Sequence, residues 1–142
     1  IVIKLNCARF CRIYSSLLKS GISVTKSLEI LSRTLSNFYY QRTLQKAVEG
    51  VQKGINLSKI IYEDKKIFPV LVPQMIEVGE ETGKTEEVLA KLADFYEEEV
   101  SQITKNLSSI IEPILMLLIG SAVGVFAVSI IQPMYSVMDN IK

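Results

Sequence analysis

The amino-acid sequence predicts an all-α protein, a six-helix bundle whose last helix continues into a transmembrane helix. Apolar residues recur every three or four positions through the first 110 residues, without an alternating strand pattern or an Asn-Gly or Asp-Gly hairpin signal. Residues 113–138 carry no charged side chain, and about 20 consecutive apolar residues suffice to cross a bilayer. A chain of 142 residues could hardly bury such a helix on every face, so a span is favoured over a core helix.

The first two predicted helices form a hairpin around Gly21, a structural turn. Helical spacing in the first helix is shown by Phe10, Ile13, Tyr14, Leu17 and Leu18. Glycine commonly ends a helix, and the hydroxyl of Ser23 can then cap the next one. The second apolar face is expected to contain Val24, Leu28, Leu31 and Leu35.

Three shorter helices are predicted next. Ser36 or Asn37 can open the third helix, which ends at Gly54 and has its apolar face at Tyr40, Leu44, Val48 and Val51. Asn56 can cap a short fourth helix, which is followed by a break at residues 68–69. The fifth helix covers about residues 70–82 and is predicted to end in a left-handed turn at Gly83, with Val72, Met75, Ile76 and Gly79 toward the core.

The sixth predicted helix is the longest. Its apolar positions are Val88, Leu92, Phe95 or Tyr96, Val100, Ile103, Leu107 and Ile110. Pro113 is expected to kink this helix rather than end it, because the apolar pattern resumes directly after the proline. Within the span, Gly120 and Gly124 lie four residues apart and would let another helix approach closely, either from the same full-length protein or from a second copy.

The composition argues against an enzyme and against a nucleic-acid-binding protein. The chain has no histidine, and it lacks the phosphate-binding and nucleophile motifs that would supply common chemistry. The formal charge of +1 gives no overall attraction for nucleic acid. Cys7 and Cys11 lie four residues apart on one helix face, somewhat too far for an unstrained disulfide, so two buried thiols are favoured over a redox pair.

Charge is distributed unevenly along the chain. Residues 1–66 contain 12 Lys and Arg and 4 Asp and Glu, a net charge of +8, whereas residues 77–112 contain 3 and 10, a net charge of −7. The simpler interpretation is that the two halves pack in one bundle and their charges pair or are solvated at its surface. The alternative is that the two faces dock different partners.

Acidic residues form the candidate interaction surface, which comprises Glu77, Glu80, Glu81, Glu97 and Glu98. Those near Gly83, together with Glu86 and Glu87, could supply oxygen ligands to a divalent cation. The alternation of Asp, Asn and Gly that shapes a calcium loop is absent, so we expect no metal and no cofactor. Glu86 and Glu87 suit the positive end of the sixth helix instead.

Several of these motifs together resemble the type II secretion system F family, which supplies platform proteins of type II secretion, type IV pilus and competence machines. The resemblance rests on Met-Ile-Glu-Val-Gly-Glu-Glu-Thr-Gly at residues 75–83, Leu-Ala-Asp-Phe-Tyr-Glu-Glu-Glu-Val at 92–100 and Glu-Pro-Ile at 112–114. Ala-Arg-Phe at residues 8–10 and Leu-Leu-Lys-Ser-Gly-Ile at 17–22 resemble the opening of the same domain. Members have two copies of a six-helix cytoplasmic domain and three membrane helices, whereas this chain holds one copy and one span. The Glu112-Pro113 junction and the tail Gln-Pro-Met-Tyr at 132–135 resemble the second copy and the end of such a protein, so the chain resembles the C-terminal portion.

This resemblance implies a domain organisation and a function. Residues 1–111 would form a cytoplasmic helical bundle, 112–138 a transmembrane helix and 139–142 an extracytoplasmic tail, in a bacterial inner membrane. Glu112, Pro113, Gly120 and Gly124 would serve membrane helix packing. The protein would be a non-enzymatic scaffold that couples a cytoplasmic hexameric assembly ATPase to pilin or pseudopilin subunits. Other inner-membrane assembly proteins and a second copy of the chain are further expected partners.

Two other classes of protein remain open at this point. A single-pass membrane adaptor with a helical protein-binding domain, unrelated to pilus assembly, is the second interpretation. A carboxylate-dependent metalloenzyme is the third.

Overall fold

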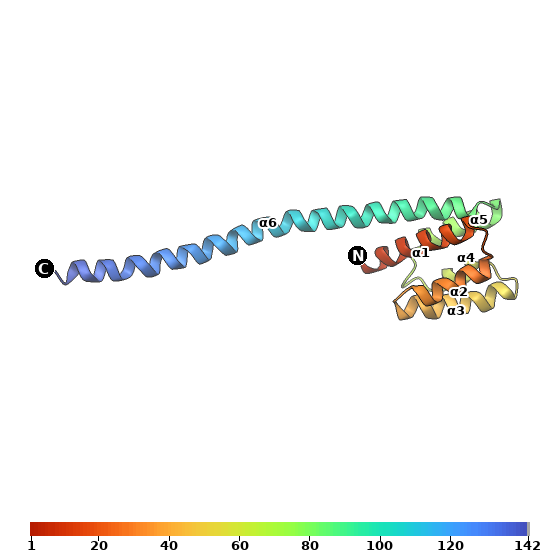
Figure 1. Ribbon diagram of the computed structural model, residues 1–142, viewed down its shortest axis with the longest axis horizontal. Helices are drawn as coiled ribbons and strands as arrows, with labels where there is room; N and C mark the ends of the chain where they lie inside the picture. Colours follow the sequence, from red (N-terminus) through yellow and green to blue (C-terminus); the bar gives the residue numbers. More distant parts are fainter. Residues whose placement is uncertain (142) are drawn as a thin grey trace. The chain divides into compact units, whose positions relative to one another are not determined.

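The computed structural model describes residues 1–141, which form six helices and no strand. In order, the helices are α1 (Val2–Lys19), α2 (Val24–Thr34), α3 (Phe38–Gln52), α4 (Leu57–Glu63), α5 (Leu71–Thr82) and α6 (Thr85–Asp139) (Figure 1). The chain divides into two compact units, Ile1–Ser101 and the part that begins at Gln102. The first unit is a bundle of α1 to α5 with the start of α6, and the second is the remainder of α6. The predicted all-α class is confirmed.

An aromatic cluster fills the core of the bundle. The ring of Phe68 packs edge-on against Phe10 and Tyr40, with centroid distances of 5.2 and 4.8 Å. The sequence predicted only a break at residues 68–69, yet Phe68 is 1% exposed. The connection from α4 to α5 is therefore anchored by a core side chain, which packs against α1 and α3.

The helix caps agree with the sequence at two positions and differ at a third. Ser23 Oγ accepts a hydrogen bond from the Lys26 amide at 3.3 Å, as predicted. Asn37 Oδ1 accepts one from the Tyr39 amide at 3.0 Å, so Asn37 rather than Ser36 opens α3. The prediction that the side chain of Asn56 caps α4 was wrong, because Asn56 precedes that helix without a side-chain cap bond.

The apolar faces follow the predicted spacing in the core of the bundle, whereas the predicted α6 positions Leu107 and Ile110 lie in the second unit and are 45% and 58% exposed. Two predicted positions also differ within the bundle. Val24 is 39% exposed, while Leu28, Leu31 and Leu35 are buried as expected. In α6 the core position is Tyr96 rather than its neighbour Phe95, which is 46% exposed.

A tight turn joins α5 to α6. Gly83 ends α5 in the left-handed conformation, with φ of 70°, as predicted. Gly79 lies so close to the start of α6 that a Cβ added to it would be only 2.8 Å from the Thr85 Cα. Both glycines are needed for this hairpin, Gly83 for its backbone angle and Gly79 for the close approach.

Helix α6 continues through Pro113 and also contains Pro133. Its apolar segment has a mean hydropathy of 2.7 over 18 residues, and none of those residues is buried within the protein. By length and composition this is a candidate membrane span, because a helix with apolar side chains exposed on every face is stable in lipid and not in water.

Candidate functional site

The acidic residues predicted as an interaction surface have different environments in the bundle. Glu77 and Glu81 are exposed on α5, and Glu98 is exposed on α6. Glu80 is partly buried and bonds to α4, and Glu97 is exposed and bonds to Arg12 of α1. Proximity in the sequence therefore did not reveal that Glu80 and Glu97 connect helices of the bundle.

The Glu80 carboxylate supplies the missing cap of α4. Its two oxygens accept hydrogen bonds from the Leu57 amide at 2.8 Å and from the Ser58 hydroxyl at 2.6 Å. The Ser58 amide lies 3.4 Å from the same carboxylate. A negative group at a helix start satisfies amides that have no partner within the helix and interacts favourably with the helix dipole. Glu80 thus fixes α5 against α4, a role that the sequence analysis missed.

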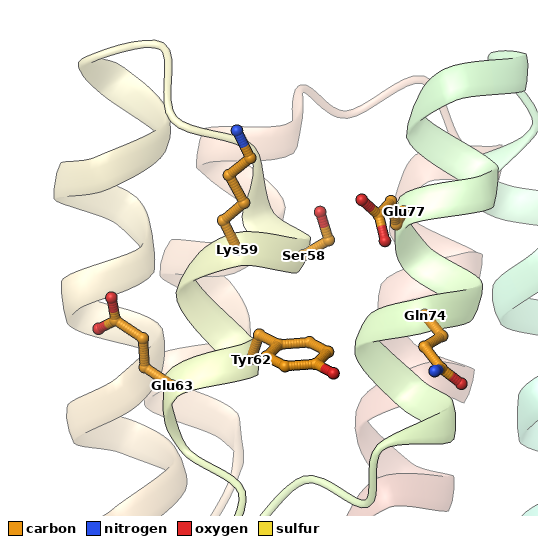
Figure 2. A pocket seen from close by; sticks show the side chains of 6 residues that line it. All are labelled: Ser58, Lys59, Tyr62, Glu63, Gln74 and Glu77. Carbon is orange, nitrogen blue, oxygen red and sulfur yellow. The ribbon is translucent and has the colours of Figure 1, made fainter.

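Next to this contact, a groove of about 420 Å³ runs between α4 and α5. Its lining comprises Ser58, Lys59, Tyr62, Glu63, Gln74 and Glu77. Figure 2 shows Glu77 pointing toward Ser58 across the groove and the hydroxyl end of Tyr62 pointing toward Gln74. The groove is open and mixed in charge, which suits side chains of a protein partner better than an enclosed small molecule.

A charge network joins α1 to α6. The Arg12 guanidinium donates to both oxygens of Glu97, each at 2.9 Å, and to Asp94 at 2.5 Å. Lys4 pairs with Glu99 at 3.0 Å. The hydrogen bonds from Arg12 hold the pKa of the Glu97 carboxyl below its usual range. The opposite charges of the two halves of the chain are therefore partly used within the bundle.

Both cysteines are buried thiols without a disulfide, as the sequence favoured. Burial raises the pKa of Cys7 to about 11, although a hydrogen bond with Tyr40 opposes this shift. Burial also raises the pKa of Cys11. A thiol that stays protonated at neutral pH is a poor nucleophile, so the pair has the properties of core residues. Within residues 1–141, no three His, Cys, Asp or Glu side chains lie close enough to hold a metal ion.

The predicted packing residues of the membrane helix lie in the second unit. A Cβ at Gly120 or Gly124 would meet no atom within 4 Å, so both positions are open to an approaching helix. Glu112 is exposed immediately before Pro113. These positions are available for contacts that the single chain does not make.

The sequence could have indicated Arg12, but not its partners. Arg12 is the one basic residue between the buried positions Cys11 and Tyr14 of α1, which places a cation at the edge of an apolar face. Such a residue often extends its charged end toward a neighbouring helix. Which helix lies there depends on the packing of the bundle.

Comparison with known proteins gives one family. The model of type II secretion system protein F matches residues 10–133. A type IV pilus assembly protein PilC of Myxococcus xanthus is 35% identical over 98% of this chain and 33% of its own length. A PilC of Thermus thermophilus is 31% identical over 95% of this chain and 33% of its length. A type II secretion system protein F of Xanthomonas campestris is 30% identical over 99% and 35%.

These relatives extend well beyond the matched region, because the chain spans about a third of their length. The match nevertheless runs across both the bundle and the apolar part of α6. It includes the motif around Gly83 and the Glu112-Pro113 pair on which the resemblance was based. The chain therefore belongs to the type II secretion system protein F family.

Proposed function

We propose that this chain is the C-terminal part of a non-enzymatic platform protein of the bacterial inner membrane, which couples a cytoplasmic assembly ATPase to pilin or pseudopilin subunits. The observation that carries the proposal is a family match that covers a helical bundle and an adjoining candidate span in one chain. Relatives are named for type IV pilus assembly and for type II secretion. A membrane scaffold accounts for this architecture without requiring a catalytic centre.

The proposed topology places residues 1–111 in the cytoplasm, 112–138 in the membrane and 139–142 outside. Pro113 supports a boundary near Glu112, because the last charged residue before the span directly precedes it. The exposed Glu77, Glu81 and Glu98 would then face cytoplasmic partners.

Mechanical coupling would use the continuity of α6. This helix contains both the acidic residues that bind Arg12 and the apolar segment, with no break from Thr85 to Asp139. The Arg12 pairs and the Gly79 contact connect its first turns to α1 and α5. A force applied to the bundle would therefore reach the membrane through a continuous helical backbone. Gly120 and Gly124 would hold neighbouring membrane helices, including those of a second copy.

Co-purification of the full-length protein with the hexameric ATPase tests the proposal. We expect Glu77→Lys combined with Glu81→Lys to weaken the association in a salt-dependent way, because complementary charges steer docking. Lys53→Glu, on the exposed end of α3, is the control for a changed surface charge. Failure of the unaltered protein to bind ATPase or pilin would instead favour a single-pass adaptor of another process. Turnover that depends on an added metal would favour the metalloenzyme.

A further inference from the structure

An aromatic and basic surface formed by α3 and the connection after α4 has no role in the core or in the contacts described above. It consists of Phe38, Tyr39, Arg42, Lys46 and Lys66, called here the aromatic–basic cluster. The side chains of Phe38 and Tyr39 are 68% and 66% exposed, although the next residue, Tyr40, is buried. Two adjacent aromatic side chains that lie outside the core and are this exposed indicate a surface that contacts an apolar or amphipathic partner.

The cations of the cluster surround a hollow of about 240 Å³. Its lining comprises Tyr39, Arg42, Thr43, Lys46, Asp64, Lys66 and Ile67. Three cations and one carboxylate give the hollow a net charge of +2, and the Asp64 carboxylate accepts a hydrogen bond from Thr43 at 2.6 Å. In the part of the chain that the structure describes, Arg42, Lys46 and Lys66 form no ion pair. Their charge is available to an anionic ligand.

The cluster lies at the end of the bundle where α6 leaves it. The Tyr40 hydroxyl, at the start of α3, bonds to the carbonyl of Ile67 and lies 3.4 Å from that of Ile3. The adjacent Lys4 pairs with Glu99, near the point where the first unit ends at Ser101. Pro113 follows only twelve residues later, and even a fully extended segment of that length spans about 40 Å. A tether of this length keeps the bundle within reach of any membrane that α6 enters.

We propose that the aromatic–basic cluster binds the anionic phospholipid headgroups of the membrane that α6 enters. Lipid phosphates match the positive hollow, and the aromatic rings match the boundary between headgroups and acyl chains, where such side chains are enriched. Each Lys or Arg near an anionic surface favours binding by about fivefold, so a net charge of +2 in the hollow contributes on the order of 25-fold. Bound headgroups would restrict the motion of the bundle on its tether, whichever machine the protein serves.

The chain contains no tryptophan, so Tyr39→Trp places a single fluorescent probe in the cluster. The full chain with this change is reconstituted in nanodiscs of phosphatidylcholine, with or without phosphatidylglycerol, and brominated lipids serve as quenchers. We expect quenching and a blue-shifted emission only with phosphatidylglycerol. Raising salt from about 0.1 to about 1 M shortens the Debye length from about 10 to about 3 Å and should reverse both effects.

Charge removal and matched controls distinguish headgroup binding from other causes. In the same background, Arg42→Gln, Lys46→Gln and Lys66→Gln together should abolish the effect of phosphatidylglycerol. A control variant with three Lys→Gln changes, at Lys19, Lys53 and Lys84, which are exposed and outside the cluster, should retain the effect of phosphatidylglycerol. Carbonate extraction checks insertion and circular dichroism checks helix content for each variant. Because neither ATPase nor pilin is present, the result is independent of the proposed function.

Three results would overturn the proposal. Equal quenching with and without phosphatidylglycerol would show that anionic headgroups are not recognised. An equal loss in the control triple variant would attribute the effect to net charge alone. Restoration of the blue shift in phosphatidylcholine discs by millimolar inorganic phosphate would identify the hollow as a site for a soluble anion. The salt dependence of the Tyr39→Trp protein keeps the test decisive if the triple variant fails to fold.

Discussion

Replacing Glu80 with alanine tests whether a carboxylate on α5 holds the start of α4. The change removes the acceptor of the Leu57 amide and of the Ser58 hydroxyl, which lie 2.8 and 2.6 Å from the carboxylate oxygens. Both residues are nearly buried, Leu57 at 1% and Ser58 at 4% exposure, so water replaces the lost acceptor poorly. The first turn of α4 would lose its cap and its link to α5 together.

The expected loss follows from the two short hydrogen bonds. A hydrogen bond to a charged group contributes about 1.5–3 kcal/mol, and removal of a helix cap costs about 1 kcal/mol. These two free energies describe the same contact and are not added. Partial access of water to the site lowers the cost of losing the contact, so we expect a destabilisation of about 2 kcal/mol. For a bundle of this size, that corresponds to a decrease in Tm of roughly 10 °C. Glu80→Gln keeps one acceptor oxygen and should lose about half as much.

Thermal unfolding of the full chain in nanodiscs, followed by circular dichroism, measures the global effect. Hydrogen exchange followed by mass spectrometry measures the local one, and we expect faster exchange in a peptide that covers Leu57 to Ile61. Glu81→Ala is the matched control, because Glu81 is the exposed neighbour on the same helix. Its expected effect is within about 0.5 kcal/mol.

Equal melting temperatures for Glu80→Ala and Glu81→Ala would refute the role of Glu80 as the cap of α4. Unchanged exchange in α4, despite a lower Tm, would show that the destabilisation arises elsewhere. The role of Glu80 matters for interpreting functional assays. If Glu80 caps α4, a loss of assembly activity in a Glu80 variant reports a folding defect rather than a loss of partner binding. Glu77 provides the complementary test on the exposed face.

Three further outcomes are expected from the structure. Gly83→Val forces a branched residue to a φ of 70° and should lower the stability of the bundle by about 1 kcal/mol or more, measured by thermal melting; no loss would contradict the left-handed turn. Because Arg12 lowers the pKa of Glu97, this carboxylate stabilises the fold above its ordinary pKa range and the effect disappears as the pH falls through the lowered pKa. Glu97→Gln should therefore cost up to about 1 kcal/mol at pH 7, and the cost should shrink as melts are repeated at pH values falling through the lowered pKa. Gly124→Leu should insert normally but abolish pilus assembly or secretion, measured by carbonate extraction and a machine assay, whereas full activity would indicate a glycine that faces lipid.

The local features of the fold could be predicted from the sequence because each depends on neighbouring residues. Helical spacing defined six helices, and Gly83 indicated a left-handed stop that the structure contains. The length and apolarity of residues 113–138 predicted a candidate span without any knowledge of packing. The family could also be recognised without knowledge of packing, because its motifs are short runs of consecutive residues.

The interactions that join helices could not be predicted in the same way. Leu57 and Glu80 are 23 residues apart, and Arg12 and Glu97 are 85 apart, so their contacts exist only after α1, α4, α5 and α6 have packed. Asn56 had the residue type of a cap, yet a carboxylate from another helix occupies that role.

The sequence by itself therefore determined the helices, the candidate span and the family of this protein. Only the tertiary structure decided that Glu80 and Glu97 connect helices, and which basic residues have no ion pair within the described chain. The physical reason is that helix formation and membrane insertion depend on nearby residues, whereas the partner of a charged side chain depends on which surfaces pack together.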